Sequence, residues 1–215
     1  MTTPSIYFKQ LELGPMQNFI YLLGDPATRE AVVVDPGWEV PTILKAAEQA
    51  GYRLTKAIVT HHHFDHTRGL DELLKAVDVP VYVHTDDAPH LELPRSALKV
   101  AGDGEMVHVG QLPITLIHTP GHTKGSQCLL VGGHLLSGDT LFIKACGRCD
   151  LPDSDPRKLY DSLAHTLHRL DDETIVCPGH HYADVPLSTM GEEKRQNPFL
   201  SMPTVEDFLH LVGAG

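Results

Sequence analysis

The chain has 215 residues, of which 41% are hydrophobic and 21% are charged, and its formal net charge at pH 7 is −11. These proportions predict a globular protein with a sizeable core rather than a disordered chain. The acidic balance argues against nucleic acid, whose recognition needs a basic surface, and against an anionic membrane surface. Histidine, the commonest metal ligand, is unusually frequent at 15 residues.

Nothing in the sequence indicates a membrane span or an exported protein. No apolar run approaches the roughly 20 residues that a transmembrane helix needs. The first ten residues, MTTPSIYFKQ, lack the basic and apolar regions of a secretory signal. The four cysteines form no secreted disulfide pattern, so we expect a cytoplasmic protein. Cys146 and Cys149 have the C-x-x-C spacing of a redox pair or half a zinc site, but incidental thiols are the better interpretation.

The first half of the sequence predicts strands followed by an alternation of helices and strands. Apolar and β-branched runs indicate the strands, and helical spacing with Pro and Gly signals indicates the helices. In chain order we expect strands between residues 6 and 34 (chiefly 19–23 and 31–34), a helix over 41–50, a strand over 56–60, a helix over 67–77 and a strand over 81–84. Asp35-Pro36-Gly37 reads as the turn after the strand over 31–34.

The second half follows the same plan. We expect a strand over 112–118, a hairpin of 127–131 and 134–136 about Gly132-Gly133, a helix over 156–168, a strand over 174–177, a charged helical stretch over 191–195 and an amphipathic helix over 205–211. The alternation predicts an α/β fold of two facing sheets with outer helices. We expect one domain over residues 1–215, with a short helical tail from about residue 187.

The strongest local feature is the run THHHFDH over residues 60–66. On an extended segment, residues two apart project to the same side, so His61 and His63 can bind one ion while the residue between them points away. The chain then turns, and Asp65 and His66 can face a second ion. Imidazole with carboxylate ligands suits zinc, and also iron or manganese.

Three later turns each place a further ligand after a predicted strand. Pro120-Gly121-His122 and Pro178-Gly179-His180 share one form, and Ser137-Gly138-Asp139 supplies a carboxylate able to bridge two ions. An isolated turn of this kind is more often structural. Together with the run over 60–66, the three turns predict a catalytic metal site held by loops on a rigid scaffold.

The succession HxHxDH, PGHT, SGDTLF and PGHxY resembles the metallo-β-lactamase superfamily. The resemblance implies an αββα sandwich with a dinuclear metal site at one edge. It also implies a ligand set in which the first ion is held by His61, His63 and His122, the second by Asp65, His66 and His180, with Asp139 as the bridge. Asp35 matches the aspartate that orients ligands from behind in this family, although an ordinary turn aspartate is the alternative.

The resemblance also narrows the activity. Antibiotic-cleaving members generally have a cysteine where Asp139 stands, and RNA-processing members carry large insertions that this chain lacks. The segments 138–142, 146–148 and 188–198 resemble the branch of glyoxalase II-like thioester hydrolases and persulfide dioxygenases. The segments 16–19, 147–151 and 197–199 resemble zinc-dependent hydrolases of polyketide clusters, whose expected substrates are thioesters, among them acyl groups on carrier proteins.

The expected function is hydrolysis of a small or carrier-bound thioester by a hydroxide held between two divalent ions, zinc in first place. Asp65 would hold the hydroxide in line and take its proton. An acyl carrier protein is a possible partner. The alternatives are a persulfide dioxygenase with one iron on His61, His122 and Asp139, a lactonase, and a non-catalytic binding protein on the same fold.

The substrate contacts are less well marked. Glutathione-using members usually carry a basic residue just after the Asn-Pro of the tail, where this chain has Phe199-Leu200-Ser201. Lys144 and Arg148 are candidates to replace that residue, and Tyr182 is a candidate to line the pocket. Each of the three has an ordinary surface or packing role as its alternative.

Overall fold

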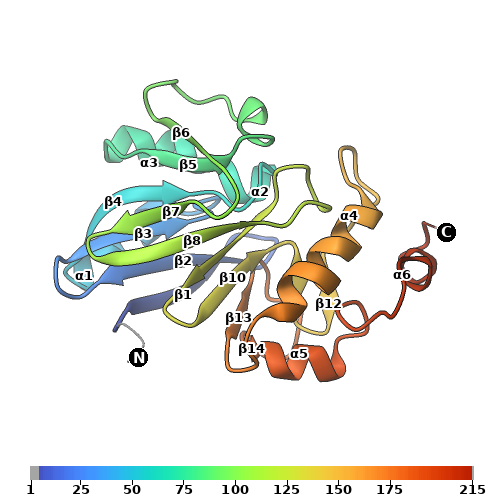
Figure 1. The fold of residues 1–215 in the computed structure, drawn as a ribbon. Coiled ribbons are helices and arrows are strands. Elements are labelled where there is room, and N and C mark those ends of the chain that lie inside the picture. The colour runs from blue at the N-terminus through green and yellow to red at the C-terminus, as the bar shows by residue number, and fades with distance from the viewer. Residues whose placement is uncertain (1–4, 215) are drawn as a thin grey trace.

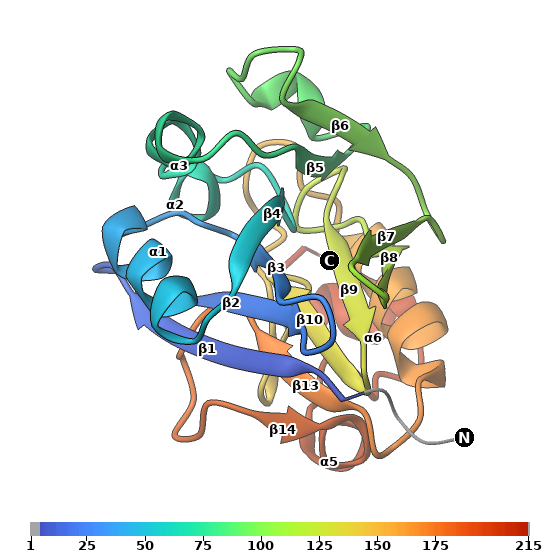
Figure 2. The same ribbon diagram turned by 90° about the vertical axis from the view of Figure 1, so that its left-hand side faces the viewer.

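The computed structural model of the protein describes residues 5–214 and contains two six-stranded sheets between layers of helices (Figure 1). The first four residues of the segment searched above for a secretory signal lie outside this range. Figure 2 shows the layers from the side, with α1, α2 and α3 beside the first sheet and the C-terminal helices beyond the second.

The first sheet is antiparallel at one end and parallel at the other. Pairing is antiparallel from β1 to β3 and parallel from β3 to β6. Its strands are β1 (Tyr7–Leu13), β2 (Asn18–Asp25), β3 (Glu30–Val34), β4 (Arg53–Ile58), β5 (Val81–His84) and β6 (Leu98–Ala101), in that spatial order. The helices on this side are α1 (Val40–Gln49), α2 (Phe64–Thr67) and α3 (Leu70–Ala76), and a 3-10 turn spans Ala88–His90.

The second sheet is antiparallel except where β10 and β13 pair in parallel. In spatial order its strands are β14 (Ser188–Thr189), β13 (Ile175–Pro178), β10 (His134–Gly138), β9 (Gln127–Val131), β8 (Leu112–His118) and β7 (Met106–Val109). The remaining elements are the small pair β11 (Leu141–Phe142) and β12 (Ala145–Cys146), and the helices α4 (Pro156–Asp161), α5 (Met190–Gln196) and α6 (Val205–Leu211).

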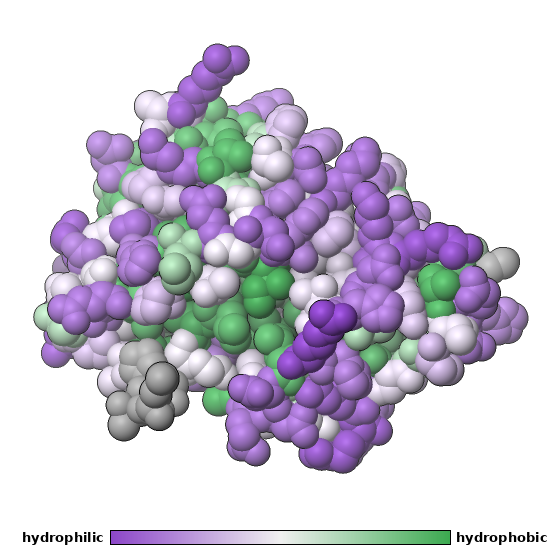
Figure 3. Space-filling model, viewed as in Figure 1, coloured by the Kyte–Doolittle hydropathy of each residue, from purple (hydrophilic) through white to green (hydrophobic). Residues whose placement is uncertain are grey.

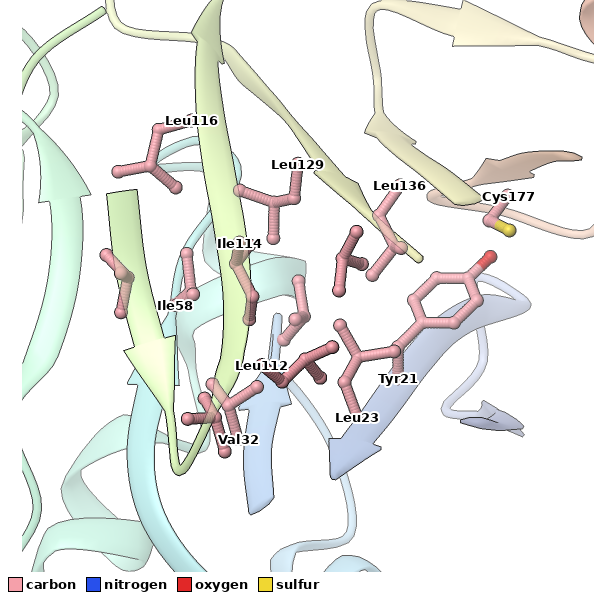
Figure 4. Packing of buried hydrophobic residues seen from close by; sticks show 14 of the residues in the cluster. Tyr21, Leu23, Val32, Ile58, Leu112, Ile114, Leu116, Leu129, Leu136 and Cys177 are labelled. Carbon is pink, nitrogen blue, oxygen red and sulfur yellow. The ribbon is translucent and has the colours of Figure 1, made fainter. Parts of the chain in front are cut away.

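Three apolar layers hold these elements together. Between the sheets, Tyr21 and Leu23 of β2 face Ile114 of β8 (Figure 4). Ile20 and Leu22, the alternate residues of β2, pack on the other side among the residues of α1 and α3. Since successive side chains of a strand point to opposite faces, β2 is buried throughout its length. With a third layer between the second sheet and α4 to α6, the predicted αββα sandwich is confirmed.

Most elements lie where the sequence predicts them, with two helices differing. The helix expected over 67–77 is two helices, because α2 begins at Phe64 and α3 begins only after Gly69. The helix expected over 156–168 is α-helical only to Asp161, and then continues as a π-helical turn and a 3-10 turn. The hairpin at Gly132-Gly133 is confirmed, with positive φ at both glycines.

The outer surface agrees with the composition. Figure 3 shows a largely hydrophilic face with apolar side chains gathered near its middle. Within residues 5–214, no helix is long and apolar enough to cross a membrane.

Candidate metal centre

The seven predicted ligands meet at one edge of the sandwich, where strands of both sheets end. β4 leads into the loop that carries His61 and His63 and then into α2, which carries Asp65 and His66. On the other sheet, β8, β10 and β13 are each followed or ended by a turn that carries a ligand, and these ligands are His122, Asp139 and His180. Ligands more than 100 residues apart in sequence therefore share one site.

The ligand atoms form three overlapping groups, each within 4.8 Å: His61, His63 and His122; His61, His66 and Asp139; Asp65, His66 and His180. The first and third groups are the two ion sites that the resemblance implies. Asp139 lies between them, because its two carboxylate oxygens are 3.4 Å from His66 Nε2 and 3.6 Å from His122 Nε2. This is the position that a bridging carboxylate requires.

A close backbone approach fixes the helix that carries two of the ligands. Asp35 begins the turn after β3, and this turn packs directly on α2. A Cβ at Gly37 would lie 1.7 Å from the carbonyl oxygen of Asp65, so only glycine allows the contact. The contact brings the Asp35 carboxylate to 2.9 Å from His66 Nδ1, while its oxygens also accept hydrogen bonds from the backbone N–H and hydroxyl of Thr60.

The histidine rings are held from behind. Nδ1 of His66 donates to Asp35, Nδ1 of His122 donates to the Arg148 carbonyl at 2.8 Å, and Nδ1 of His180 donates to the Met16 carbonyl at 2.9 Å. A neutral imidazole that donates through Nδ1 presents a lone pair at Nε2. When neutral, each of the three rings directs that lone pair into the site, which is the arrangement found around metal ligands.

The imidazole nitrogens and carboxylate oxygens that face the site carry lone pairs and lie close together, so a bound cation would stabilise them. Nε2 of His66 and Nε2 of His180 are 3.2 Å apart, and both are 3.3 Å from the same oxygen of Asp65. His61 Nε2 and Asp139 Oδ1 are buried without a hydrogen-bond partner. Buried polar atoms are normally paired, so these orphans need a ligand. Five imidazoles and two carboxylates fit divalent zinc, iron or manganese.

Electrostatics divides the site into two halves. Burial lowers the pKa of His180, but hydrogen bonds to the Asp139 and Asp65 carboxylates outweigh it and raise this pKa to about 10. On the other side, burial and the neighbouring His122 lower the pKa of His63 to about 4. Positive charge is thus favoured beside the carboxylates, while the histidine-rich half offers neutral lone pairs.

Asp87 was not predicted from the sequence, yet it joins the two loops of the histidine-rich half. This buried carboxylate accepts hydrogen bonds from the backbone N–H of His62 at 2.8 Å, the hydroxyl of Thr123 at 2.8 Å and the backbone N–H of Gly125 at 2.7 Å. His62 adjoins two ligands and Thr123 adjoins His122. No sequence signal separates Asp87 from its neighbour Asp86, because its partners lie 25 to 38 positions away.

Asn18 and Trp38 form a second support that sequence reasoning missed. The Asn18 amide donates to Asp65 Oδ2 at 2.9 Å, and the Trp38 indole N–H donates to the Asn18 carbonyl oxygen at 2.9 Å. Asn18 falls in a segment noted only for its resemblance to the polyketide hydrolases. An amide that donates to a buried carboxylate keeps it oriented and ionised.

A cavity of about 560 Å³ opens above the ligands. Arg148 and Tyr182, two of the expected substrate contacts, line it, and the Tyr182 ring stacks on His180 at 4.6 Å. Lys144, the third, lines a different cavity.

Cys146 and Cys149 pack at the edge of the third apolar layer. Burial raises the pKa of the Cys146 thiol to about 12, so it is not a reactive thiolate.

Comparison with known proteins finds relatives in sequence and in structure. The sequence model of the Metallo-beta-lactamase superfamily matches residues 13–180. A hydroxyacylglutathione hydrolase from Erwinia tasmaniensis is 36% identical over 166 residues, which cover 77% of this chain and 62% of that protein. PksB of Bacillus subtilis, a probable polyketide biosynthesis zinc-dependent hydrolase, is 27% identical over 192 residues (89% and 85%). The crystal structure of ETHE1 from Myxococcus xanthus superimposes with a TM-score of 0.88 at 34% identity, covering 96% of this chain and 90% of that one.

Proposed function

The chain belongs to the metallo-β-lactamase superfamily, and on that premise we propose that it is a dinuclear hydrolase of thioesters with zinc as its metal. Members of this superfamily are mostly metal-dependent hydrolases that bind divalent ions. One observation carries the proposal: two complete ligand groups, with Asp139 between them, lie at the base of a cavity large enough for a substrate.

Divalent ions bound to these groups would activate a water molecule at neutral pH and polarise a carbonyl. The residues of the chain supply the positioning. Burial alone would raise the pKa of Asp65, but hydrogen bonds with His180 and Asn18 and the charge of His66 lower it well below its usual range. A carboxylate that stays ionised accepts a hydrogen bond from the attacking water and holds it in line. In the reaction, water adds to the carbonyl carbon and the carbon–sulfur bond breaks, which gives a carboxylic acid and a thiol.

The name of one relative, a hydroxyacylglutathione hydrolase, supports a thioester as the substrate class. The name of another, a probable polyketide biosynthesis zinc-dependent hydrolase, supports hydrolysis with zinc. The thiol carrier in this proposal is a small thiol or an acyl carrier protein.

The four cysteines of the chain are free thiols, which supports a reducing, cytoplasmic setting.

Persulfide dioxygenation with one iron on His61, His122 and Asp139 is the rival activity. Asp65, His66 and His180 form a further group outside that triad, which supports a second ion in the proposed hydrolase, and the metal content decides between the two activities. Lactone hydrolysis uses the same water activation and differs only in the bond that breaks.

The test is a direct assay of the zinc-loaded protein on acyl thioesters of glutathione, coenzyme A and acyl carrier protein, with the released thiol measured by a chromogenic reagent. We expect turnover that Asp139→Asn lowers at least 100-fold, while Glu72→Gln on the exposed side of α3 serves as the control. Failure of every thioester, together with oxygen uptake by the iron-loaded protein on glutathione persulfide, would replace this proposal with the dioxygenase.

A further inference from the structure

The cavity above the ligands has an apolar wall. Its floor consists of metal-ligand side chains, and its sides include Met16, Phe64, Phe142, Leu151, Pro152 and Tyr182. These residues come from four separate segments of the chain: the β1–β2 turn, α2, the region from β11 to α4, and the loop after β13. Elements of both sheets therefore contribute to one apolar surface around the site.

Three of these side chains are exposed although they are large and apolar. Phe64 is 58% exposed, Tyr182 57% and Met16 37%. Single exposed apolar residues are common on protein surfaces, but a group of them around the mouth of one cavity indicates a binding surface. The cost of exposing them is best explained by contact with an apolar ligand.

The aromatic part of the wall is held in place. Tyr182 lies flat on His180, with an interplanar angle of 10°, and meets the edge of Phe142 at 5.5 Å. Phe64 meets Trp38 edge-on at 6.4 Å. Because these contacts fix the rings before a ligand arrives, little side-chain entropy is lost on binding.

The charges around the cavity do not suit an anionic ligand group. Arg148 is the one lysine or arginine among the described residues that line it. Its guanidinium is already bound by the two carboxylate oxygens of Asp150, at 2.9 and 3.1 Å. Asp153, also on the lining, is paired with Lys124. Apart from the metal ions proposed at its floor, the described lining therefore offers a carboxylate of glutathione only an arginine that is already paired.

We propose that the apolar wall binds the acyl chain of the substrate, so that the enzyme prefers thioesters of apolar acids to those of small hydroxy acids. This inference rests on the thioester hydrolysis proposed above. The thiol carriers of biological thioesters are built largely from polar amides, whereas acyl groups are often apolar. The apolar wall therefore suits the acyl group of the substrate better than its thiol carrier. With the carbonyl above the ligands, the first carbons of the chain lie against Phe142 and Tyr182 and the later ones reach Phe64 and Met16.

The experiment measures kcat/KM of the zinc-loaded protein for N-acetylcysteamine thioesters with acyl groups from acetyl to octanoyl. This neutral carrier isolates the effect of the acyl chain. We expect kcat/KM to rise about threefold to fourfold for each added methylene, the effect of removing one methylene from water. A flat or falling series, or faster turnover of the lactoyl than of the octanoyl ester, would overturn the inference.

Matched variants locate the effect. Phe64→Ser and Met16→Ser should each reduce the slope of the series, whereas Met106→Ser, on β7 and as exposed as Phe64, should leave it unchanged. Metal content is measured for every variant, so that a loss of metal is not mistaken for weaker binding of the acyl chain. Equal slopes in all three variants would contradict a role for the wall.

A binding measurement separates this inference from the proposed reaction. The S-octyl and S-methyl thioethers of N-acetylcysteamine cannot be hydrolysed, and calorimetry gives their affinities whether or not the protein cleaves thioesters. We expect the octyl compound to bind at least tenfold more tightly, with the difference reduced in Phe64→Ser. If no thioester is cleaved but the octyl compound still binds more tightly, the proposed hydrolysis is wrong and the proposed binding of apolar chains is supported. Equal affinities of the two compounds would contradict the binding of apolar chains, even if thioesters are cleaved.

Discussion

At the scale of single residues, four of the seven ligands of the candidate metal centre are held by partners that lie behind them, away from the ion sites. Asp35 and two backbone carbonyls fix the rings of His66, His122 and His180. Asp87 acts one step further away, because it fixes the backbone of the loops that carry His63 and His122 rather than the rings themselves. Such outer partners set metal affinity almost as strongly as the ligands do.

Replacing Asp87 by asparagine tests this role. The amide has nearly the same size, but its NH2 group cannot accept the hydrogen bonds that the carboxylate receives from the two loops. We expect zinc to bind about 10 to 100 times more weakly, as measured by competition with a fluorescent chelator. Asp78→Asn changes an exposed carboxylate that belongs to no candidate metal-ligand group of the described residues, and it should bind zinc like the unaltered protein. Equal affinities in the two variants would show that the loops do not need Asp87.

The residue patterns could predict the ligands and, through the family resemblance, the supporting Asp35, but not the supports Asp87 and Asn18. The seven ligands stand out because strand ends and Pro-Gly-His turns mark them locally. Asp87 and Asn18 act on groups that are 25 or more positions distant, so nothing in their neighbourhood reveals them. Lys144 was expected as a replacement for the basic residue missing from the tail, but it lines a different cavity.

At the scale of elements, the site depends on the contact between the Asp35 turn and α2. The backbone approach at Gly37 leaves no room for a side chain. This contact brings the Asp35 carboxylate to His66 and keeps Asp65 beside Asn18.

Gly37→Ala should therefore disturb both stability and the metal centre. The added methyl group would meet the Asp65 carbonyl, so one of the two segments must move, at a cost of about 1–3 kcal/mol in the free energy of unfolding. Denaturant unfolding measures the cost, and metal analysis should show a loss of bound ions. Gly102→Ala is the control, because a Cβ there meets nothing within 4 Å. An unchanged unfolding midpoint for Gly37→Ala would contradict the account of this contact.

Elements with strong local signals were predicted closely, and weakly marked ones were not. β6 and β7 were not predicted because each is an edge strand of only four residues with an apolar side chain on its exposed face, Val100 in β6 and Met106 in β7. The start of α2 at Phe64 was not predicted, because the preceding residue is His63 and histidine gives no N-cap signal.

At the scale of the whole molecule, the C-terminal helices belong to the packed layers. Phe208 of α6 is fully buried, and its ring lies 5.7 Å from Tyr160 and 6.4 Å from Phe199. Met190 of α5 lies in the same layer as Leu135 of β10. The tail expected from about residue 187 thus covers the outer face of the second sheet.

Truncation of Phe208 measures how much this layer contributes. Phe208→Ala leaves a cavity among aromatic neighbours and should lower the free energy of unfolding by about 3–5 kcal/mol. Leu211→Ala, on the exposed face of the same helix, should change it by less than about 0.5 kcal/mol. Similar small effects for both variants would mean that α6 contributes little to the stability of the fold.

The overall architecture could be predicted because alternation, strand-end histidines and family resemblance all indicated facing sheets with outer helices. The extent of the single domain stays a prediction. The metal identity and the substrate could not be read from sequence, because zinc and iron accept the same histidine and carboxylate ligands. The character of the cavity wall could not be read either, since its residues come together only in the folded chain.

The dinuclear centre is tested first by the metal content of the protein, purified without chelator, supplied with both zinc and iron, and measured by mass spectrometry. We expect two ions per chain, chiefly zinc or a mixture of zinc and iron, because Asp139 lies between two complete ligand groups. A single iron per chain, unchanged when more metal is supplied, would contradict the dinuclear centre and the hydrolysis built on it.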